Sequence, residues 1–97
     1  MKFIATFLLT PEARGRDEAI GRFRKTGGKP PEGVTRLGRW TAADFSGGID
    51  LLESNDAGAL TEFALMWSDV MELKIVPVLE DKESNAVLQR AGKQVTE

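Results

Sequence analysis

Two carboxylates are the residues of this sequence best suited to a chemical role. Glu53 ends the apolar row that contains Ile49 and Leu51, and Asp69 follows Trp67 at the end of a helix-sized segment. A carboxylate in a water-poor pocket can act as a general base. Glu53 and Asp69 are therefore the candidate catalytic residues. The simpler structural alternatives are a solvent-exposed edge position for Glu53 and bonds from Asp69 to backbone amides of the following turn.

Trp40 and Trp67 could contribute to a binding site. Each indole combines a large apolar area with one polar N–H group, which suits the wall of a pocket as well as a core. The register of a predicted hairpin decides what lies beside Glu53. A loop of Ser46-Gly47, or of residues 45–48, places Trp40 opposite Glu53, whereas a loop of residues 45–47 places Arg39 there. We favour Trp40.

The residue types that are missing exclude several kinds of chemistry. The 97 residues contain no Cys, no His and no Tyr. Disulfides, thiolate nucleophiles, iron–sulfur clusters and cysteine zinc sites are therefore excluded, and so is histidine acid–base chemistry. We expect no metal site and no cofactor.

Charge and hydropathy indicate where such a protein works. The net charge is −2, which argues against a general nucleic-acid binder, because such proteins neutralise phosphates with Lys and Arg. No stretch approaches the ~20 apolar residues of a membrane span. The apolar start, Phe3 to Leu9, lacks a cleavage site for a secretory signal. We expect a cytoplasmic protein that binds neither nucleic acid nor membrane.

Hydrophobic periodicity and the positions of Gly and Pro predict seven helices and strands. Four are strands and three are helices, the first capped by Thr10 and the second by Asp56. The strands are expected at residues 2–9, at about 34–44 and 49–54 on either side of a turn at 45–48, and at 72–79. The helices are expected at residues 11–26, 57–69 and 81–91, the last with Val87, Leu88 and Ala91 facing inward, followed by a fraying tail.

This order, βαββαβ with a C-terminal helix, predicts an α+β protein of ferredoxin-like fold. Two right-handed crossovers give a four-stranded antiparallel sheet in the order 4-1-3-2 with both main helices on one face. We expect a single domain over residues 1–97, with a core over about 1–91 and a tail over 92–97. RNA-recognition domains share the strand order, but they stack bases on aromatics of the third strand, and residues 48–53 contain none.

Alternation makes both faces of this sheet apolar. The first strand offers Phe3, Ala5, Phe7 and Leu9 to one side and Ile4, Thr6 and Leu8 to the other. Two helices cover one face, and monomers rarely leave the other bare. We therefore expect a homodimer that forms through the open sheet face.

Several short motifs resemble those of a known family. They are Pro31-Glu32-Gly33-Val34, Gly38-x-Trp40, Glu53 with Asp56, Trp67-Ser68-Asp69 and Val76-Pro77-Val78. The chain, from Met1 to about Ala91, is similar to a small family of uncharacterised proteins, a domain of unknown function, among the dimeric α+β barrels. The resemblance implies two ferredoxin-like chains packed sheet against sheet and transfers no catalytic residue.

On such a fold, the relatives place their sites between the sheet and the helices. We therefore expect a small apolar pocket lined by Trp40, Glu53, Phe63 and Trp67 that binds a small apolar or aromatic organic molecule. Two alternatives stay open. The protein is a cofactor-independent monooxygenase or isomerase with Glu53 or Asp69 as general base, or a purely structural or interaction module that dimerises.

Overall fold

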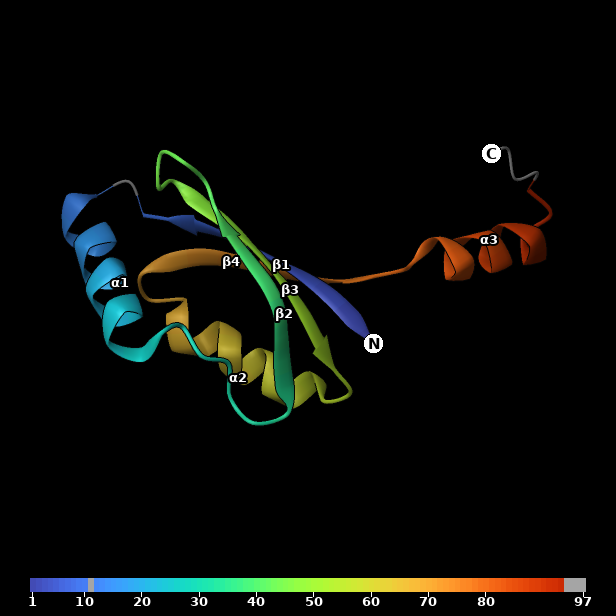
Figure 1. Ribbon diagram of the computed structural model, residues 1–97, viewed down its shortest axis with the longest axis horizontal. Helices are drawn as coiled ribbons and strands as arrows, with labels where there is room; N and C mark the ends of the chain where they lie inside the picture. The colour runs from blue at the N-terminus through green and yellow to red at the C-terminus, as the bar shows by residue number, and fades with distance from the viewer. Residues whose placement is uncertain (11, 94–97) are drawn as a thin grey trace.

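The chain alternates strands and helices in the predicted order. A computed structural model describes residues 1–10 and 12–93. The elements are β1 (Lys2–Leu9), α1 (Ala13–Thr26), β2 (Val34–Thr41), β3 (Gly47–Ser54), α2 (Ala57–Trp67), β4 (Met71–Val78) and α3 (Asp81–Arg90) (Figure 1). The tail predicted to fray lies outside the described residues from residue 94 onward.

The four strands form one antiparallel sheet in the order β2-β3-β1-β4, with α1 and α2 against one face (Figure 1). The predicted ferredoxin-like fold and strand order are therefore confirmed. Pro77 lies in the edge strand β4, where a missing N–H costs no ladder bond on the outer side. None of the described helices is long and apolar enough to cross a membrane.

Alternation along the strands decides which side chains meet the helices. In β1, Ala5 faces α1 and α2 together with its cross-strand partners Asp50 and Ile75, whereas Ile4 faces the other way. The core lies between the sheet and these two helices. Its buried apolar members are Ala5, Ala19, Val34, Leu52, Ala59, Leu60, Phe63, Trp67 and Val70.

The helix caps follow the prediction for α2 but not for α1. Asp56 caps α2, because its Oδ1 accepts a hydrogen bond of 3.1 Å from the backbone N–H of Ala59. The prediction that Thr10 caps α1 is wrong. The chain stays extended at Glu12, which takes the N-cap position without a side-chain bond, so that α1 begins only at Ala13.

The hairpin turn lies earlier than predicted. Its centre is Asp44 and Phe45: the Phe45 N–H donates to the Ala42 carbonyl, and Asp44 Oδ1 accepts from both the N–H and the hydroxyl of Ser46. These bonds lower the pKa of Asp44 below its usual range. Gly47 and Gly48 already belong to β3, where a Cβ atom would run into the backbone oxygens of the neighbouring strands. The glycines therefore permit close strand approach and do not form the turn.

Helix α3 contradicts the sequence-based expectation. Val87 and Leu88 were expected to face inward, yet α3 has no buried residue and stands away from the sheet (Figure 1). The connection from β4 consists of Leu79 and Glu80 alone, so the helix continues outward from the end of its strand. Ala91, expected in the same stripe, is the C-cap.

Candidate functional site

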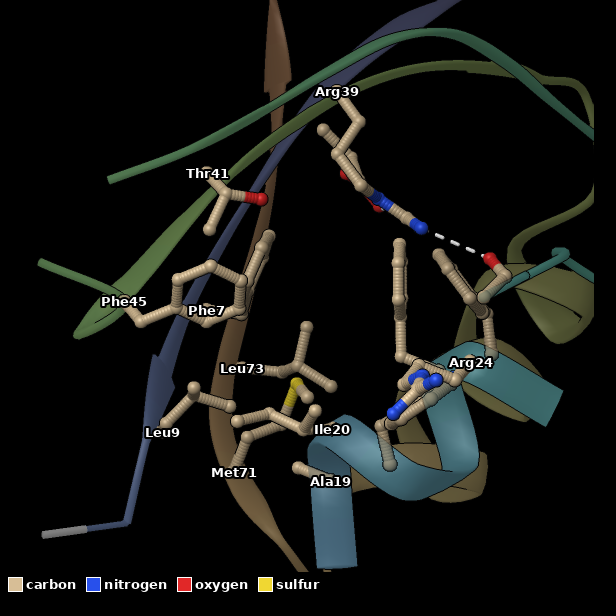
Figure 2. A pocket seen from close by; sticks show the side chains of 15 residues that line it. Phe7, Leu9, Ala19, Ile20, Arg24, Arg39, Thr41, Phe45, Met71 and Leu73 are labelled. Atoms are coloured by element: carbon tan, nitrogen blue, oxygen red, sulfur yellow. Dashed lines mark hydrogen bonds and ion pairs between the residues drawn. The ribbon is translucent and has the colours of Figure 1, made fainter. Parts of the chain in front are cut away.

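A cavity of about 250 Å³ lies between α1 and the helix-covered face of the sheet (Figure 2). Figure 2 shows α1 side chains such as Ile20 on one side and sheet side chains such as Leu73 on the other. The full lining consists of Phe7, Leu9, Ala19, Ile20, Phe23, Arg24, Gly28, Arg39, Thr41, Phe45, Asp50, Phe63, Trp67, Met71 and Leu73.

Local sequence explains why the space stays open. Alternation turns large side chains of β1 and β4 toward α1, including Phe7 and Leu73. On the helix side, the buried residue is Ala19, whose methyl group fills little volume. Gly28 adds no side chain to the lining. The mismatch of large side chains with small ones leaves an apolar hollow.

Two exposed aromatic residues frame the hollow. Phe23 comes from α1 and Phe45 from the β2–β3 hairpin. Phe45 has φ of 61°, a left-handed conformation that a bulky residue rarely adopts. Two hydrogen bonds hold the turn in that shape: the Ser46 N–H donates to Asp44, and the Phe45 N–H donates to the Ala42 carbonyl. These bonds keep the strained backbone of Phe45 in place and thereby hold its aromatic ring at the edge of the cavity.

A buried ion pair supplies two of the three charged residues of the cavity wall, and Arg24 of α1 is the third. Arg39 Nε and Nη2 donate to the two oxygens of Asp50 at 2.6 and 2.8 Å, and Nη2 also donates to the Gly28 carbonyl at 2.9 Å. The side chains of Arg39 and Asp50 are 13% and 4% exposed. The guanidinium also lies 5.2 Å from the centre of the Phe23 ring. The charges of Arg39 and Asp50 neutralise each other, and apart from Arg24 the other side chains that line the cavity are uncharged.

The structure separates the four residues predicted to line one pocket. Phe63 and Trp67 line the cavity, whereas Trp40 and Glu53 lie on the opposite, helix-free face. The physical reason is strand alternation: the helices cover the face that carries Asp50 and Leu52, so Glu53 lies on the other face of β3. A β-bulge between Arg36 and Gly38 and the early turn pair Trp40 with Ile49, not with Glu53. Arg39 consequently faces the helices, and Trp40, its neighbour, points away from them.

Glu53 pairs across the strands with Thr35 and is exposed. Trp40 lies over Gly38, where any Cβ atom would meet its ring. The predicted contact between the Trp40 indole and the Glu53 carboxylate is therefore wrong.

Asp69 does not border the cavity either. Its two oxygens accept hydrogen bonds of 2.9 and 2.8 Å from Arg22, which also lies over the Trp67 ring at 5.5 Å. The Arg22 hydrogen bonds lower the pKa of Asp69, which makes it a weaker base. Asp69 and Glu53 both lie outside the water-poor space, so the prediction that either is a general base in a pocket is wrong.

The sequence reasoning missed Arg39 and Asp50. A signal was available, because Asp50 interrupts the apolar run from Ile49 to Leu52, and a buried aspartate requires a partner. The correct hairpin register would have identified Arg39 as that partner. Within residues 1–10 and 12–93 no three acidic side chains gather as ligands for a metal ion.

Comparison with known proteins places the chain in a family. Residues 1–92 match the family described as Domain of unknown function (DUF3303). The chain belongs to this family. No curated protein matches it. Among solved structures, Rv0793 from Mycobacterium tuberculosis is similar at 15% identity and a TM-score of 0.39, over 82% of this chain and 95% of that one.

The buried pair predicts a strongly non-additive response to mutation. Arg39→Leu leaves the Asp50 carboxylate buried without its partner, which should lower the free energy of unfolding by about 3–5 kcal/mol. The double variant Arg39→Leu/Asp50→Leu should recover most of that loss, because both charges are gone. Urea denaturation of the two variants and the wild type measures the coupling. Equal stability of the single and double variants would contradict the assigned pair.

The Arg22–Asp69 pair predicts a pH effect of known sign. Because the pKa of Asp69 is lowered in the folded state, the pair stabilises the protein above the ordinary aspartate range and loses this contribution as the pH falls below about 4. Asp69→Asn should therefore flatten the loss of stability at acidic pH. Arg22→Gln should flatten it in the same way. Thermal unfolding between pH 2.5 and pH 7 measures both, and an acid limb as steep as that of the wild type would refute the assignment.

Proposed function

We propose that the cavity between α1 and the sheet binds a small, uncharged apolar or aromatic molecule. The observation that supports the proposal is the apolar space of about 250 Å³ with Trp67, Phe63 and Phe7 in its wall. An apolar cavity of about 150 Å³ is known to hold benzene, so this larger one suits a molecule of one or two rings. Aromatic side chains offer such a molecule edge-to-face or offset contacts.

The electrostatics of the wall favour a neutral ligand. Asp50 already accepts two hydrogen bonds from Arg39, and the Gly28 carbonyl accepts another. A charged ligand would lose its hydration shell on entering. An anion would have to compete with Asp50 for the Arg39 guanidinium, which leaves Arg24 as its one available counter-charge among the lining residues. The hydroxyl of Thr41, directed to the cavity side in Figure 2, is free to meet a single polar group of a neutral ligand.

A pair of naphthalene probes tests the binding. 2-Naphthol, which is neutral, should bind in isothermal titration calorimetry, and 2-naphthoate, which carries a charge on the same ring system, should bind at least ~10-fold more weakly. Leu73→Phe fills the cavity from β4 and should abolish binding of 2-naphthol. Trp40→Phe changes the opposite face of the sheet and serves as the control, with an unchanged dissociation constant.

Two outcomes would refute the proposal. One is the absence of any heat of binding for 2-naphthol at millimolar concentration with the wild type. The other is an equal loss of affinity in Leu73→Phe and Trp40→Phe, which would locate the site elsewhere.

We also propose that the chain forms a homodimer through the helix-free sheet face. Apolar side chains occupy the centre of this face: Ile4, Ile49, Leu51, Val76 and Trp40, with Leu8 at one end. Trp40 is 59% exposed and Leu8 56%. Residues of both charges lie around them, with Lys2 beside Glu53 and Lys74 near Glu72. An apolar centre with a mixed-charge rim is typical of an interface that pairs with a copy of itself.

Light scattering after gel filtration tests the dimer. The wild type should elute at the mass of two chains at micromolar concentration. Ile49→Asp would bury a charge near the centre of the interface and should raise the dimer dissociation constant at least ~100-fold. Leu65→Asp places the same charge at a residue of α2 that is 69% exposed and away from this face, and it should leave the dimer intact. A monomeric wild type would refute the proposal.

A further inference from the structure

The C-terminal helix α3 lacks a partner within its own chain. None of its ten residues is buried, and Figure 1 shows it beyond the end of the sheet, away from α1 and α2. Leu79, Val87 and Leu88 are all exposed, with Leu79 at 51%. Three large aliphatic side chains within ten positions of one another are therefore left in solvent. Two of them, Val87 and Leu88, belong to an otherwise polar helix, and Leu79 lies just before it.

A helix of this length does not persist on its own propensity. Isolated helices shorter than ~12–15 residues are marginal in water, because nucleation is costly and few hydrogen bonds follow. Local devices cap both ends of α3: Glu80 and Glu83 form a capping box at its start, and Gly92, with φ of 72°, ends it while the Lys93 N–H donates to the Leu88 carbonyl. These caps satisfy backbone groups, but they leave the side chains of Val87 and Leu88 exposed. Packing against another surface is what normally stabilises an amphipathic helix of this kind.

The start of α3 is tied to the body of the molecule. Lys2, the first residue of β1, forms an ion pair with Glu80, and only Leu79 and Glu80 separate β4 from the helix. The short connection directs the helix outward. The radius of gyration is 16.0 Å, against about 13 Å for a compact chain of this size. The helix therefore projects to a place where its own chain offers it no surface.

We propose that α3 packs its apolar side chains Val87 and Leu88, together with Leu79 of the preceding connection, against a second copy of this chain. The inference rests on the proposed homodimer and extends its interface beyond the sheet. Four strands of eight residues, at about 3.3 Å per residue and about 4.8 Å between strands, give the sheet face a flat projection of about 500 Å². Stable interfaces bury about 800 Å² per partner, so the sheet face alone falls short. Two-fold symmetry makes the exchange reciprocal: each chain donates one helix and receives one, which doubles the added area.

Paramagnetic labelling tests this contact directly. The chain contains no Cys, so Gln89→Cys introduces a single attachment site for a nitroxide. Labelled ¹⁴N chains are mixed with unlabelled ¹⁵N chains, and amide relaxation is measured on the ¹⁵N chains only. We expect a contiguous set of ¹⁵N amides in the mixed dimer to broaden. Unbroadened ¹⁵N amides in a mixed sample shown to be dimeric would overturn the proposal.

A matched pair of variants measures the contribution to affinity. Val87→Asp and Asn85→Asp add the same charge to the same helix, the first at an apolar position and the second at a polar one. Val87→Asp should raise the dimer dissociation constant at least ~10-fold, and Asn85→Asp should change it less than ~2-fold. Unchanged amide shifts of β1–β4 verify that both variants keep their fold.

The results separate the two proposals. A monomeric wild type overturns the homodimer and the helix exchange together. A dimeric wild type whose affinity is the same with Val87→Asp overturns only the role of α3.

Discussion

The sheet has two apolar faces, and the chain has helices in contact with only one of them. This imbalance is the constraint on which the rest of the structure depends. The short strands alternate Ala5, Phe7 and Leu9 toward α1 and α2, and Ile4 and Leu8 toward the outside. A chain of this length has too few residues for a second layer over the outer face. Apolar burial on one side thus leaves an apolar surface on the other, and α3 extends away from both.

The helix-covered face of the sheet includes a buried ion pair among its apolar side chains. Arg39 and Asp50 occupy positions where apolar residues would fill the space, and their ion pair is oriented further by the Gly28 carbonyl. A buried pair of this kind contributes little net stability, but it specifies geometry, since a shift of one residue would separate the charges. The pair thereby supports the hairpin register on which the cavity depends. The cavity itself follows from small lining residues, Ala19 and Gly28, among large ones.

Two ion pairs position the helices at opposite ends of the molecule. At one end, Arg22 of α1 binds Asp69 after α2, and its guanidinium lies over Trp67. This contact fixes the distance between the two helices that bound the cavity. At the other end, Lys2 holds Glu80 and with it the origin of α3. Between these two ends, the site that we propose for a ligand and the surface that we propose for a second chain lie on opposite faces of one sheet.

The sequence by itself determined the elements, their order and the strand arrangement, because periodicity, caps such as Asp56 and the punctuation by Gly and Pro are local properties. It also identified Phe63 and Trp67 as inward residues of α2, because helical spacing places them on one face. Only the tertiary structure decided which neighbour in the Arg39-Trp40 pair faces the helices. That choice depends on a bulge near Leu37 and on a turn centred at Phe45, and a shift of one residue in a strand reverses every side chain in it. Glu53 and Trp40 lie on the outer face because the helices cover the face that carries Asp50 and Leu52, and strand alternation alone does not determine which face the helices cover. The direction of α3 likewise could not be read from its composition.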